Sequence, residues 1–398
     1  MSTNSCPYCG NNPVNHRAMK LAESIDLLLT PMLLGMNRFH HPIIDKVIFT
    51  TIKLSVFPLK YLGVWSFHED ISKARSDRSK VIWNEAQKRG IRMQGISVWG
   101  KPIEQYRAHV EGKWRYFESL PIPPHYNQHT FTWIDDKAKL RAYLQKNNIS
   151  VAHGGYAKTF KEAVQIFKTG TPPFIVKPRT GSRGRHTTTY IYTEKELKEA
   201  FTIAKQLCYS VIVEEHLQGS VYRGTYVNGE VVGVLRGDVA HIVGDGKSSV
   251  KELISKKNSS KHAQVSNVTI TPKLKDFLAR QKLSLSTVLK RGQKVALSEK
   301  IGVEYGGFRA EMLPQTHPKI LKYLKKAGDS IGCIVVGFDF IINDVTADPD
   351  TQKWGIIEAN SLPFIDLHHT PLAGASINVA AKIWNLWTLP QHVRPKAD

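Results

Sequence analysis

The chain has 398 residues, of which 41% are hydrophobic and 22% charged. This is the composition of a soluble globular protein of two or three domains, and it excludes wholesale disorder, collagen and a disulfide-stapled miniprotein. Lys and Arg number 55 against 34 Asp and Glu, and the resulting net charge of +21 favours anionic partners: nucleotide phosphates, acidic substrates, nucleic acid or anionic lipid.

The cysteine content and the absence of targeting signals predict a location. Four scattered cysteines (Cys6, Cys9, Cys208 and Cys333) do not make a disulfide framework, which indicates a reducing compartment. The sequence shows no signal-peptide pattern and no apolar run of the ~18 residues that span a bilayer. We therefore expect a cytoplasmic protein.

The N-terminal segment, residues 1–72, opens with Cys6-x-x-Cys9, followed by His16. These are zinc-ligand types, but a complete site needs a fourth ligand, for which His40 and His41 are candidates. Because the sequence has no second Cys-x-x-Cys, the pattern favours a reduced tip without metal.

Residues 43–65 combine apolar positions with lysines seven residues apart, at Lys46, Lys53 and Lys60. On a helix this places a basic stripe beside an apolar one, as in helices that lie on anionic membranes. The alternative is a helix packed on the body of the protein or at a homodimer contact. Asp45 and Pro58 interrupt the pattern and favour the packed helix.

Residues 73–134 read as a small α/β unit, and mixed strands and helices follow it. Asp135 or Asp136 can cap the next helix, and Asn228-Gly229 predicts a hairpin turn. Hairpins mixed with crossovers indicate an α+β fold. We expect helices over 78–89, 137–146, 194–207, 319–331 and 375–386, and strands over 173–178, 187–192, 211–215, 222–227, 231–236, 334–342 and 354–358.

An apolar strand that ends in Lys177 leads into a glycine-rich basic loop, residues 179–185. Glycine lets the backbone approach an anion closely and turn its N–H groups toward it. Lys177 supplies a point charge, and Arg183 and Arg185 can fork onto phosphate oxygens. The alternative is a basic surface hairpin.

Two later strands carry oxygen ligands. Asp339 lies among apolar residues, while Glu358 and Asn360 are two positions apart and share a strand face. Two carboxylates and an amide oxygen suit Mg²⁺. The alternative is a solvated strand end. The strand 211–215 runs into a short turn whose backbone could bind an adenine edge.

Taken in order, these segments resemble the ATP-grasp superfamily of ATP-dependent carboxylate–amine ligases, and most of all the ATP-grasp domain of cyanophycin synthetase. Glutathione synthetases and D-alanine–D-alanine ligases share this plan. The resemblance covers about residues 135–386. The stretches that carry it are 241–254, 280–318 and 358–369.

The resemblance implies an ATP-grasp fold in which two α/β subdomains clasp ATP. We expect three parts: residues 1–72, a pre-ATP-grasp unit at 73–134, and an ATP-grasp domain at 135–388. The implied function is an ATP-dependent ligase that joins an amino acid or peptide carboxylate to an amine through an acyl phosphate, with ATP and Mg²⁺. A Mur-ligase-like second half has no counterpart here, so we do not expect the chain to build cyanophycin alone.

The resemblance also assigns residues. Asp339, Glu358 and Asn360 would bind Mg²⁺, and the catalytic residues would be Arg223, Arg236 and Arg309. The residues that would bind the nucleotide are Lys137, Lys177, Gly181, Ser182, Arg183, Gly184, Glu214, Glu215, His216 and Leu217. The chain departs from the family in having no carboxylate for the ribose near Val221, and in having His186 where the loop often has glycine. An ATP-binding protein without ligase activity is the alternative. Nucleic-acid binding has only the charge in its favour.

Overall fold

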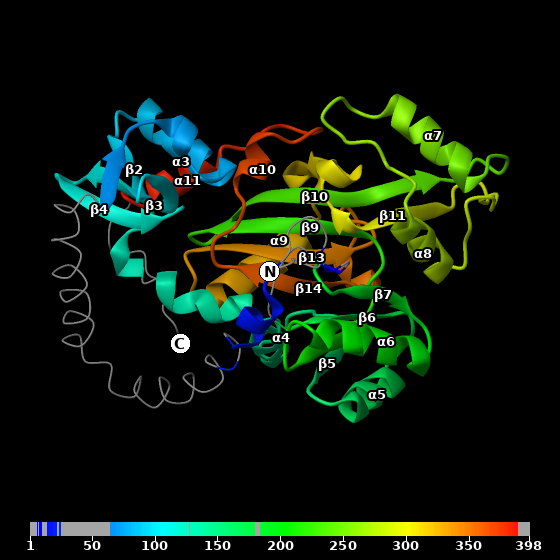
Figure 1. Cartoon of the computed structure of the whole chain (residues 1–398). Coiled ribbons are helices and arrows are strands. Elements are labelled where there is room, and N and C mark those ends of the chain that lie inside the picture. Colours follow the sequence, from blue (N-terminus) through cyan, green and yellow to red (C-terminus); the bar gives the residue numbers. More distant parts are fainter. Residues whose placement is uncertain are drawn as a thin grey trace.

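The computed structural model describes residues 6, 8–9, 14–21, 24, 64–126, 128–179 and 184–388. These residues form three sheets with helices packed around them (Figure 1). The predicted α+β class is confirmed. His40, His41 and nearly all of the predicted helix at 43–65 lie outside the described residues. No helix among the described residues is long and apolar enough to cross a membrane.

The first unit is an antiparallel sheet in the order β1-β2-β3-β4, with helix α3 packed on it. The sheet takes in residues 65–68, so this unit begins before the expected boundary at 73. Ser76 caps the helix by accepting a hydrogen bond from the backbone N–H of Ser79, and Gly90 follows its end at φ +70°. The elements are β1 (Trp65–His68), α3 (Asp77–Lys88), β2 (Met93–Val98), β3 (Lys101–Val110) and β4 (Lys113–Glu118).

The second sheet has the order β5-β8-β6-β7 and is covered by α5 and α6. Thr159 and Thr193 form capping boxes at the starts of these two helices. The apolar faces of the helices bury Ala163, Leu197 and Phe201 against the strands. The elements are β5 (Gly154–Ala157), α5 (Phe160–Thr169), β6 (Phe174–Pro178), β7 (Thr188–Ile191), α6 (Glu194–Lys205) and β8 (Val211–Glu215).

The largest sheet has the order β11-β10-β9-β13-β14, with β12 paired to β10. The predicted hairpin joins β9 to β10, where Asn228 and Gly229 both have positive φ. Helices α4 and α9 pack on this sheet, and α7 and α8 pack near the β10–β11 end. The strands are β9 (Ser220–Val227), β10 (Glu230–Val243), β11 (Lys294–Ile301), β12 (Phe308–Glu311), β13 (Val335–Ile342) and β14 (Gly355–Asn360); the helices are α4 (Lys137–Lys146), α7 (Val250–Ser260), α8 (Pro272–Arg280) and α9 (Pro318–Ile331).

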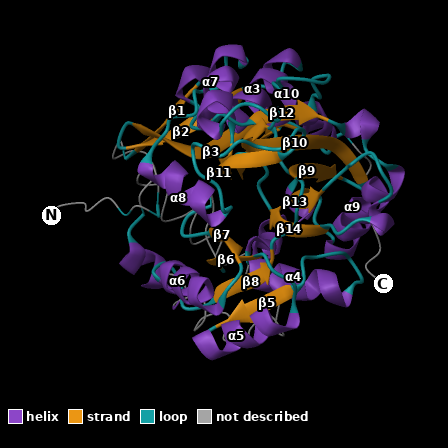
Figure 2. Ribbon diagram, turned by 90° about the vertical axis from the view of Figure 1, so that its right-hand side faces the viewer, coloured by secondary structure: helices purple, strands orange, loops and turns teal. Residues whose placement is uncertain are grey.

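The second and third sheets form separate layers that face each other across α4 (Figure 2). Short connections complete the described chain. They are the helix α10 (Asp366–His369) and 3-10 helices at Ile71–Lys73, Pro124–Tyr126, Gln128–Asp135, Val303–Tyr305, Leu313–Gln315 and Pro349–Thr351.

The last helix, α11 (Val379–Asn385), returns to the first unit and lies beside α3 (Figure 1). Trp384 is fully buried against Ile82 and Trp83, and its Nε1 donates to the Ile82 carbonyl at 3.0 Å. The helix is shorter than the predicted 375–386 because it begins only after Asn378, whose side chain caps it. The core of the first unit is therefore completed by the far end of the chain.

Candidate active site

Two lysines from different layers line one small pocket. Lys137 begins α4, where Asp136 caps the helix, and Lys177 lies near the end of β6. Lys177 is buried and its Nζ bonds to Glu214, whose other oxygen is 3.2 Å from Arg141 Nη1. The pocket is lined by Lys137, Leu140, Arg141, Leu144, Lys177, Ile212, Glu214, Ile356 and Ile357. Residues far apart in the sequence thus converge between the two sheets.

The carboxylates lie next to this pocket. The register of β13 and β14 sets Asp339 directly opposite Glu358, and Asn360 follows on the same face. Glu358 Oε1 is 3.5 Å from Lys137 Nζ, so the lysine pocket and the carboxylate pair are continuous.

Arg223 holds Asp339 from the neighbouring strand β9. Its Nε and Nη2 each lie 2.7 Å from one oxygen of the Asp339 carboxylate, a bidentate pair. Burial lowers the pKa of Arg223, but the Asp339 carboxylate outweighs it and raises the pKa above the ordinary value. Arg223 is therefore a fixed cation that orients Asp339.

The oxygens of this face fit a magnesium ion. Each Asp339 oxygen accepts one bond from Arg223 and keeps a second lone pair, and Glu358 adds a further carboxylate. The amide nitrogen of Asn360 is buried with no hydrogen-bond partner among the described residues. Carboxylate and amide oxygens are the hard ligands that Mg²⁺ takes.

The other two predicted arginines lie on adjacent strands but have different partners. Arg236 on β10 pairs with Asp238 of the same strand, with its Nη2 2.5 Å from Oδ2. Arg309 on β12 donates from Nε to the Thr370 carbonyl at 3.0 Å. The structure therefore brings Arg223 into the carboxylate cluster and leaves Arg236 and Arg309 with contacts of their own.

The segment after β8 is tied into the fold by its backbone. The N–H of Glu215 donates to the His153 carbonyl at 2.7 Å, and that of His216 to the Pro173 carbonyl at 2.8 Å. These two N–H groups are not offered to a ligand. Leu217 is buried at the end of this segment.

The glycine-rich loop is described only in part. Gly181, Ser182 and Arg183 lie outside the described residues, and Gly184 resumes the chain at φ +61°. His186 follows with φ +52°, and its side chain is buried against the N-terminal tip of the chain.

Sequence reasoning missed the role of Arg141 and the pairing of Asp136 with Arg179. Arg141 lies on the buried face of α4, between Leu140 and Leu144. An arginine at an apolar position of the helix is the sequence feature that could have identified it. Asp136 not only caps α4 but also accepts a bidentate pair from Arg179, at 2.6 to 3.1 Å. Arg179 directly follows β6, so this pair joins the end of that strand to the start of the lysine-bearing helix.

Comparisons with known proteins give the family context. No protein-family model matches the chain. It is 27% identical over 262 residues to the glutathione biosynthesis bifunctional protein GshAB of Clostridium perfringens, covering 64% of this chain and 34% of that protein. It is 30% identical over 260 residues to the cyanophycin synthetase of Geminocystis herdmanii, covering 62% of this chain and 29% of that protein.

The structure is similar to that of a bifunctional glutathione synthetase from Pasteurella multocida, with a TM-score of 0.51, 21% identity, and coverage of 78% of this chain and 44% of that chain. The chain has the ATP-grasp fold. The predicted relationship of this ATP-grasp chain to cyanophycin and glutathione synthetases is confirmed. The chain spans about a third of the length of these curated relatives.

Proposed function

We propose that this chain is an ATP-dependent carboxylate–amine ligase that forms an amide bond on an amino acid or peptide. The observation that carries the proposal is the continuity of the lysine pocket with the carboxylate face, through Lys137 and Glu358. A triphosphate needs cations along its length and hard oxygens that hold its metal ion. This cleft offers both within one small region.

The proposed nucleotide-binding residues fall into two groups, one for the phosphates and one for the adenine. Lys137 and Lys177 would neutralise phosphate oxygens, and the loop containing Gly181, Ser182, Arg183 and Gly184 would supply backbone N–H groups. The segment from Glu214 to Leu217 would border the adenine, with Glu214 holding Lys177 in place. No carboxylate for the ribose is assigned.

Asp339, Glu358 and Asn360 would hold Mg²⁺. When bound there, the ion would neutralise charge on the phosphates of ATP. Arg223 holds the Asp339 carboxylate in place through its bidentate pair, and so acts as a positioning residue rather than as the catalytic group expected from the resemblance.

The reaction follows from the substrate chemistry. A carboxylate oxygen attacks the γ-phosphorus of ATP, the bond to the β-phosphate oxygen breaks, and ADP leaves. The amine then attacks the acyl carbon, loses a proton and expels inorganic phosphate. Positioning and charge neutralisation do most of this work, and Arg309 and Arg236 are proposed to face the acyl phosphate or the acid substrate.

The test is phosphate release from ATP, Mg²⁺ and pooled amino acids by the full chain, with products identified by mass spectrometry. We expect Glu358→Gln to lower turnover by ~100-fold or more, because removing one electrostatic group from such a site costs about this much. Glu230→Gln is the matched control, since Glu230 is an exposed hairpin residue paired with Lys382. Turnover equal to wild type in a folded Glu358→Gln protein would contradict the metal assignment.

ATP binding without phosphate release in any substrate pool would instead favour the second function, an ATP-binding protein without ligation. Binding of a fluorescent ATP analogue to wild type separates this outcome from simple loss of the site.

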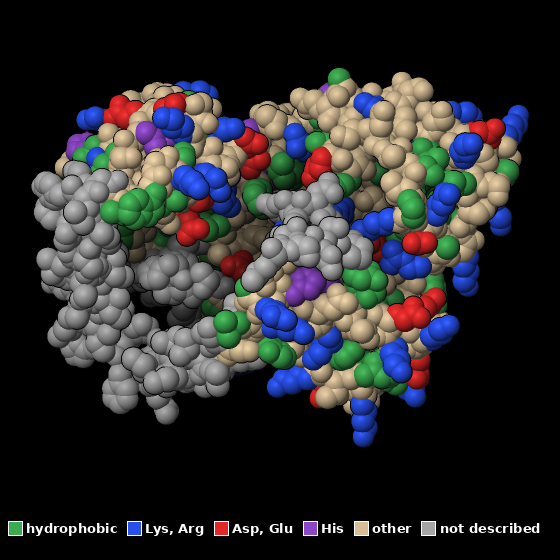
Figure 3. All heavy atoms as spheres, viewed as in Figure 1, with side chains coloured by type: hydrophobic (Ala, Val, Ile, Leu, Met, Phe, Trp, Pro, Cys, Tyr) green, Lys and Arg blue, Asp and Glu red, His purple; other side chains and the backbone are tan. Residues whose placement is uncertain are grey.

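We further propose a reducing, cytoplasmic setting, which the four free cysteines support. Lys and Arg side chains are spread over the face in Figure 3 rather than gathered in one patch, which favours small anionic ligands over nucleic acid. Membrane or homodimer contact through residues 43–65 stays a prediction.

A further inference from the structure

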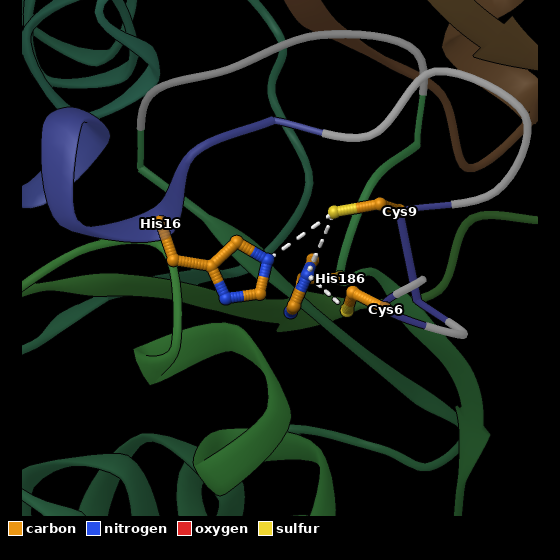
Figure 4. Close-up of side chains that lie close together, drawn as sticks. All are labelled: Cys6, Cys9, His16 and His186. Carbon is orange, nitrogen blue, oxygen red and sulfur yellow. Dashed lines mark hydrogen bonds between the residues drawn. The ribbon is translucent and has the colours of Figure 1, made fainter. Parts of the chain in front are cut away.

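Four metal-ligand side chains meet where the N-terminal tip contacts the ATP-grasp body. They are Cys6, Cys9, His16 and His186, and their ligand atoms all lie within 4.8 Å of one another (Figure 4). The first three come from the tip, and the fourth comes from the chain just after the glycine-rich loop, 177 residues beyond Cys9.

The contact is shaped by the backbone as well as by side chains. The N–H of Cys9 donates to the Cys6 carbonyl at 3.2 Å, closing a tight Cys-x-x-Cys turn that points both sulfurs to one side. The N–H of His186 donates to the Tyr8 carbonyl at 3.2 Å, inside the same turn. A backbone hydrogen bond therefore fixes the position of the Cys-x-x-Cys turn against the segment that contains His186.

The tautomer of His186 leaves one nitrogen ready to ligate. Its Nδ1 lies 2.8 Å from the Ile203 carbonyl, which can only accept, so Nδ1 carries the proton and Nε2 has a bare lone pair. A hydrogen bond of this kind from the second ring nitrogen is the usual support of a metal-bound histidine. The bare Nε2 faces both sulfurs, 3.3 Å from Cys6 Sγ and 3.4 Å from Cys9 Sγ.

The sulfur–nitrogen distances are those expected between ligands of one tetrahedral ion. The single lone pair of His186 Nε2 cannot accept good hydrogen bonds from two thiols at once. A cation between the three atoms would instead bind the nitrogen and both sulfurs. Zinc–sulfur and zinc–nitrogen bonds of about 2.3 and 2.0 Å place sulfur and nitrogen about 3.5 Å apart across a tetrahedron. The three sulfur–nitrogen distances here are 3.3, 3.3 and 3.4 Å, including Cys9 to His16.

Burial and charge agree with this set. Cys9 and His186 are 2% and 1% exposed, so a net charge here would be costly. Two thiolates carry a charge of −2 and two neutral imidazoles carry none, so together they balance the charge of a divalent ion. Soft sulfur ligands with imidazole in a closed, four-ligand arrangement are typical of structural zinc.

We propose that Cys6, Cys9, His16 and His186 bind one structural Zn²⁺ ion, which ties the N-terminal tip to the chain that follows the glycine-rich loop. His186 replaces His40 and His41 as the fourth ligand, and the metal-free tip that the sequence favoured is replaced by a closed site. The ion closes a long loop of chain, and such a link is stabilising because it restricts the unfolded state.

The first test measures zinc in the full chain, purified under reducing conditions and dialysed against metal-free buffer. We expect about one zinc ion per chain in wild type, and loss of most of it in Cys9→Ser and His186→Ala. Cys333→Ala is the matched control, because Cys333 is a buried thiol in the core that donates to the Val335 carbonyl. It should keep the wild-type zinc content.

A second measurement covers the case in which a variant folds poorly. His186→Cys would replace a nitrogen ligand with a sulfur and should retain the zinc that His186→Ala loses. Cobalt substitution of wild type should give the intense visible absorption of a tetrahedral ion and a thiolate charge-transfer band. Wild type that takes up no zinc or cobalt, a Cys6–Cys9 disulfide in reduced preparations, or full zinc content in His186→Ala would overturn the proposal.

Discussion

His216, the residue after β8, is held neutral by its surroundings. Its ring stands edge-on to Tyr190, and its Nδ1 is buried without a hydrogen-bond partner among the described residues. Burial lowers the pKa of His216 from 6.5 to about 4; it outweighs the nearby Glu214 carboxylate, which raises the pKa, and Lys177 adds a smaller lowering effect. The unfolded chain takes up a proton near pH 6.5, whereas the folded chain resists protonation down to about pH 4.

The pH dependence of stability follows from that difference. The contribution of neutral His216 is complete above about pH 6.5 and is lost as the pH falls toward 4, by about 2 kcal/mol between pH 7 and pH 5. We expect His216→Gln to lose less unfolding free energy over this interval than wild type does. Urea denaturation at pH 7 and at pH 5 measures the unfolding free energy of each protein. An equal loss of unfolding free energy between the two pH values in wild type and variant would contradict the assigned pKa.

Some site residues could be read from the sequence because their geometry is local. Glu358 and Asn360 share a face through the two-residue period of a strand, and Asp136 caps the helix that follows it. His186 could not be assigned in this way, because its partners lie some 180 residues earlier and only the fold brings them together. The sequence feature that pointed to His186 was a histidine at a loop position where the family often has glycine.

A buried network at the scale of elements joins β9, β12 and α10. His368 is fully buried, with Nδ1 donating to Glu311 at 2.6 Å and Nε2 2.7 Å from the Thr225 hydroxyl. Burial raises the pKa of Glu311, but hydrogen bonds from His368 and the Val234 N–H outweigh it and hold the pKa below its usual value. Gly233 makes room, since a Cβ there would lie 2.6 Å from His368 Nδ1.

We expect His368→Ala to destabilise the protein by about 3 kcal/mol, because it leaves the Glu311 carboxylate buried without its main partner. The measurement is a double-mutant cycle with Glu311→Gln, followed by urea denaturation. The double variant should lose less than the sum of the single variants, as expected for residues in contact. Strict additivity would show that the two side chains do not stabilise each other.

Element bounds were predictable where caps and apolar periodicity agree. The helix at 137–146 and the strand at 211–215 were predicted to the residue. The strand predicted at 231–236 extends instead to Val243, because β10 also pairs with β11 and β12. Arg236 and Asp238 break the apolar pattern within this strand, so its length is set by partners that local sequence does not reveal.

At the scale of the whole molecule, α11 packs beside α3 and so links the C-terminal part of the described chain to the unit at residues 65–118. We expect Trp384→Ala to cost about 3 to 5 kcal/mol, the usual loss for a large aromatic side chain in a core. Trp99→Ala is the matched control, since Trp99 is 73% exposed and its loss should change stability by about 0.5 kcal/mol or less. Urea denaturation followed by circular dichroism compares them; similar losses in both variants would contradict the shared core.

The position of α11 sets an order of events during protein synthesis. The ribosome makes α3 and its sheet early, yet Ile82 and Trp83 find their packing partner only when Trp384 has emerged. A nascent chain would therefore carry an uncovered apolar surface over the 302 residues that separate Ile82 from Trp384, a state that invites aggregation or chaperone binding. The core around α3 would therefore be completed only after the strands of the two later sheets have been made.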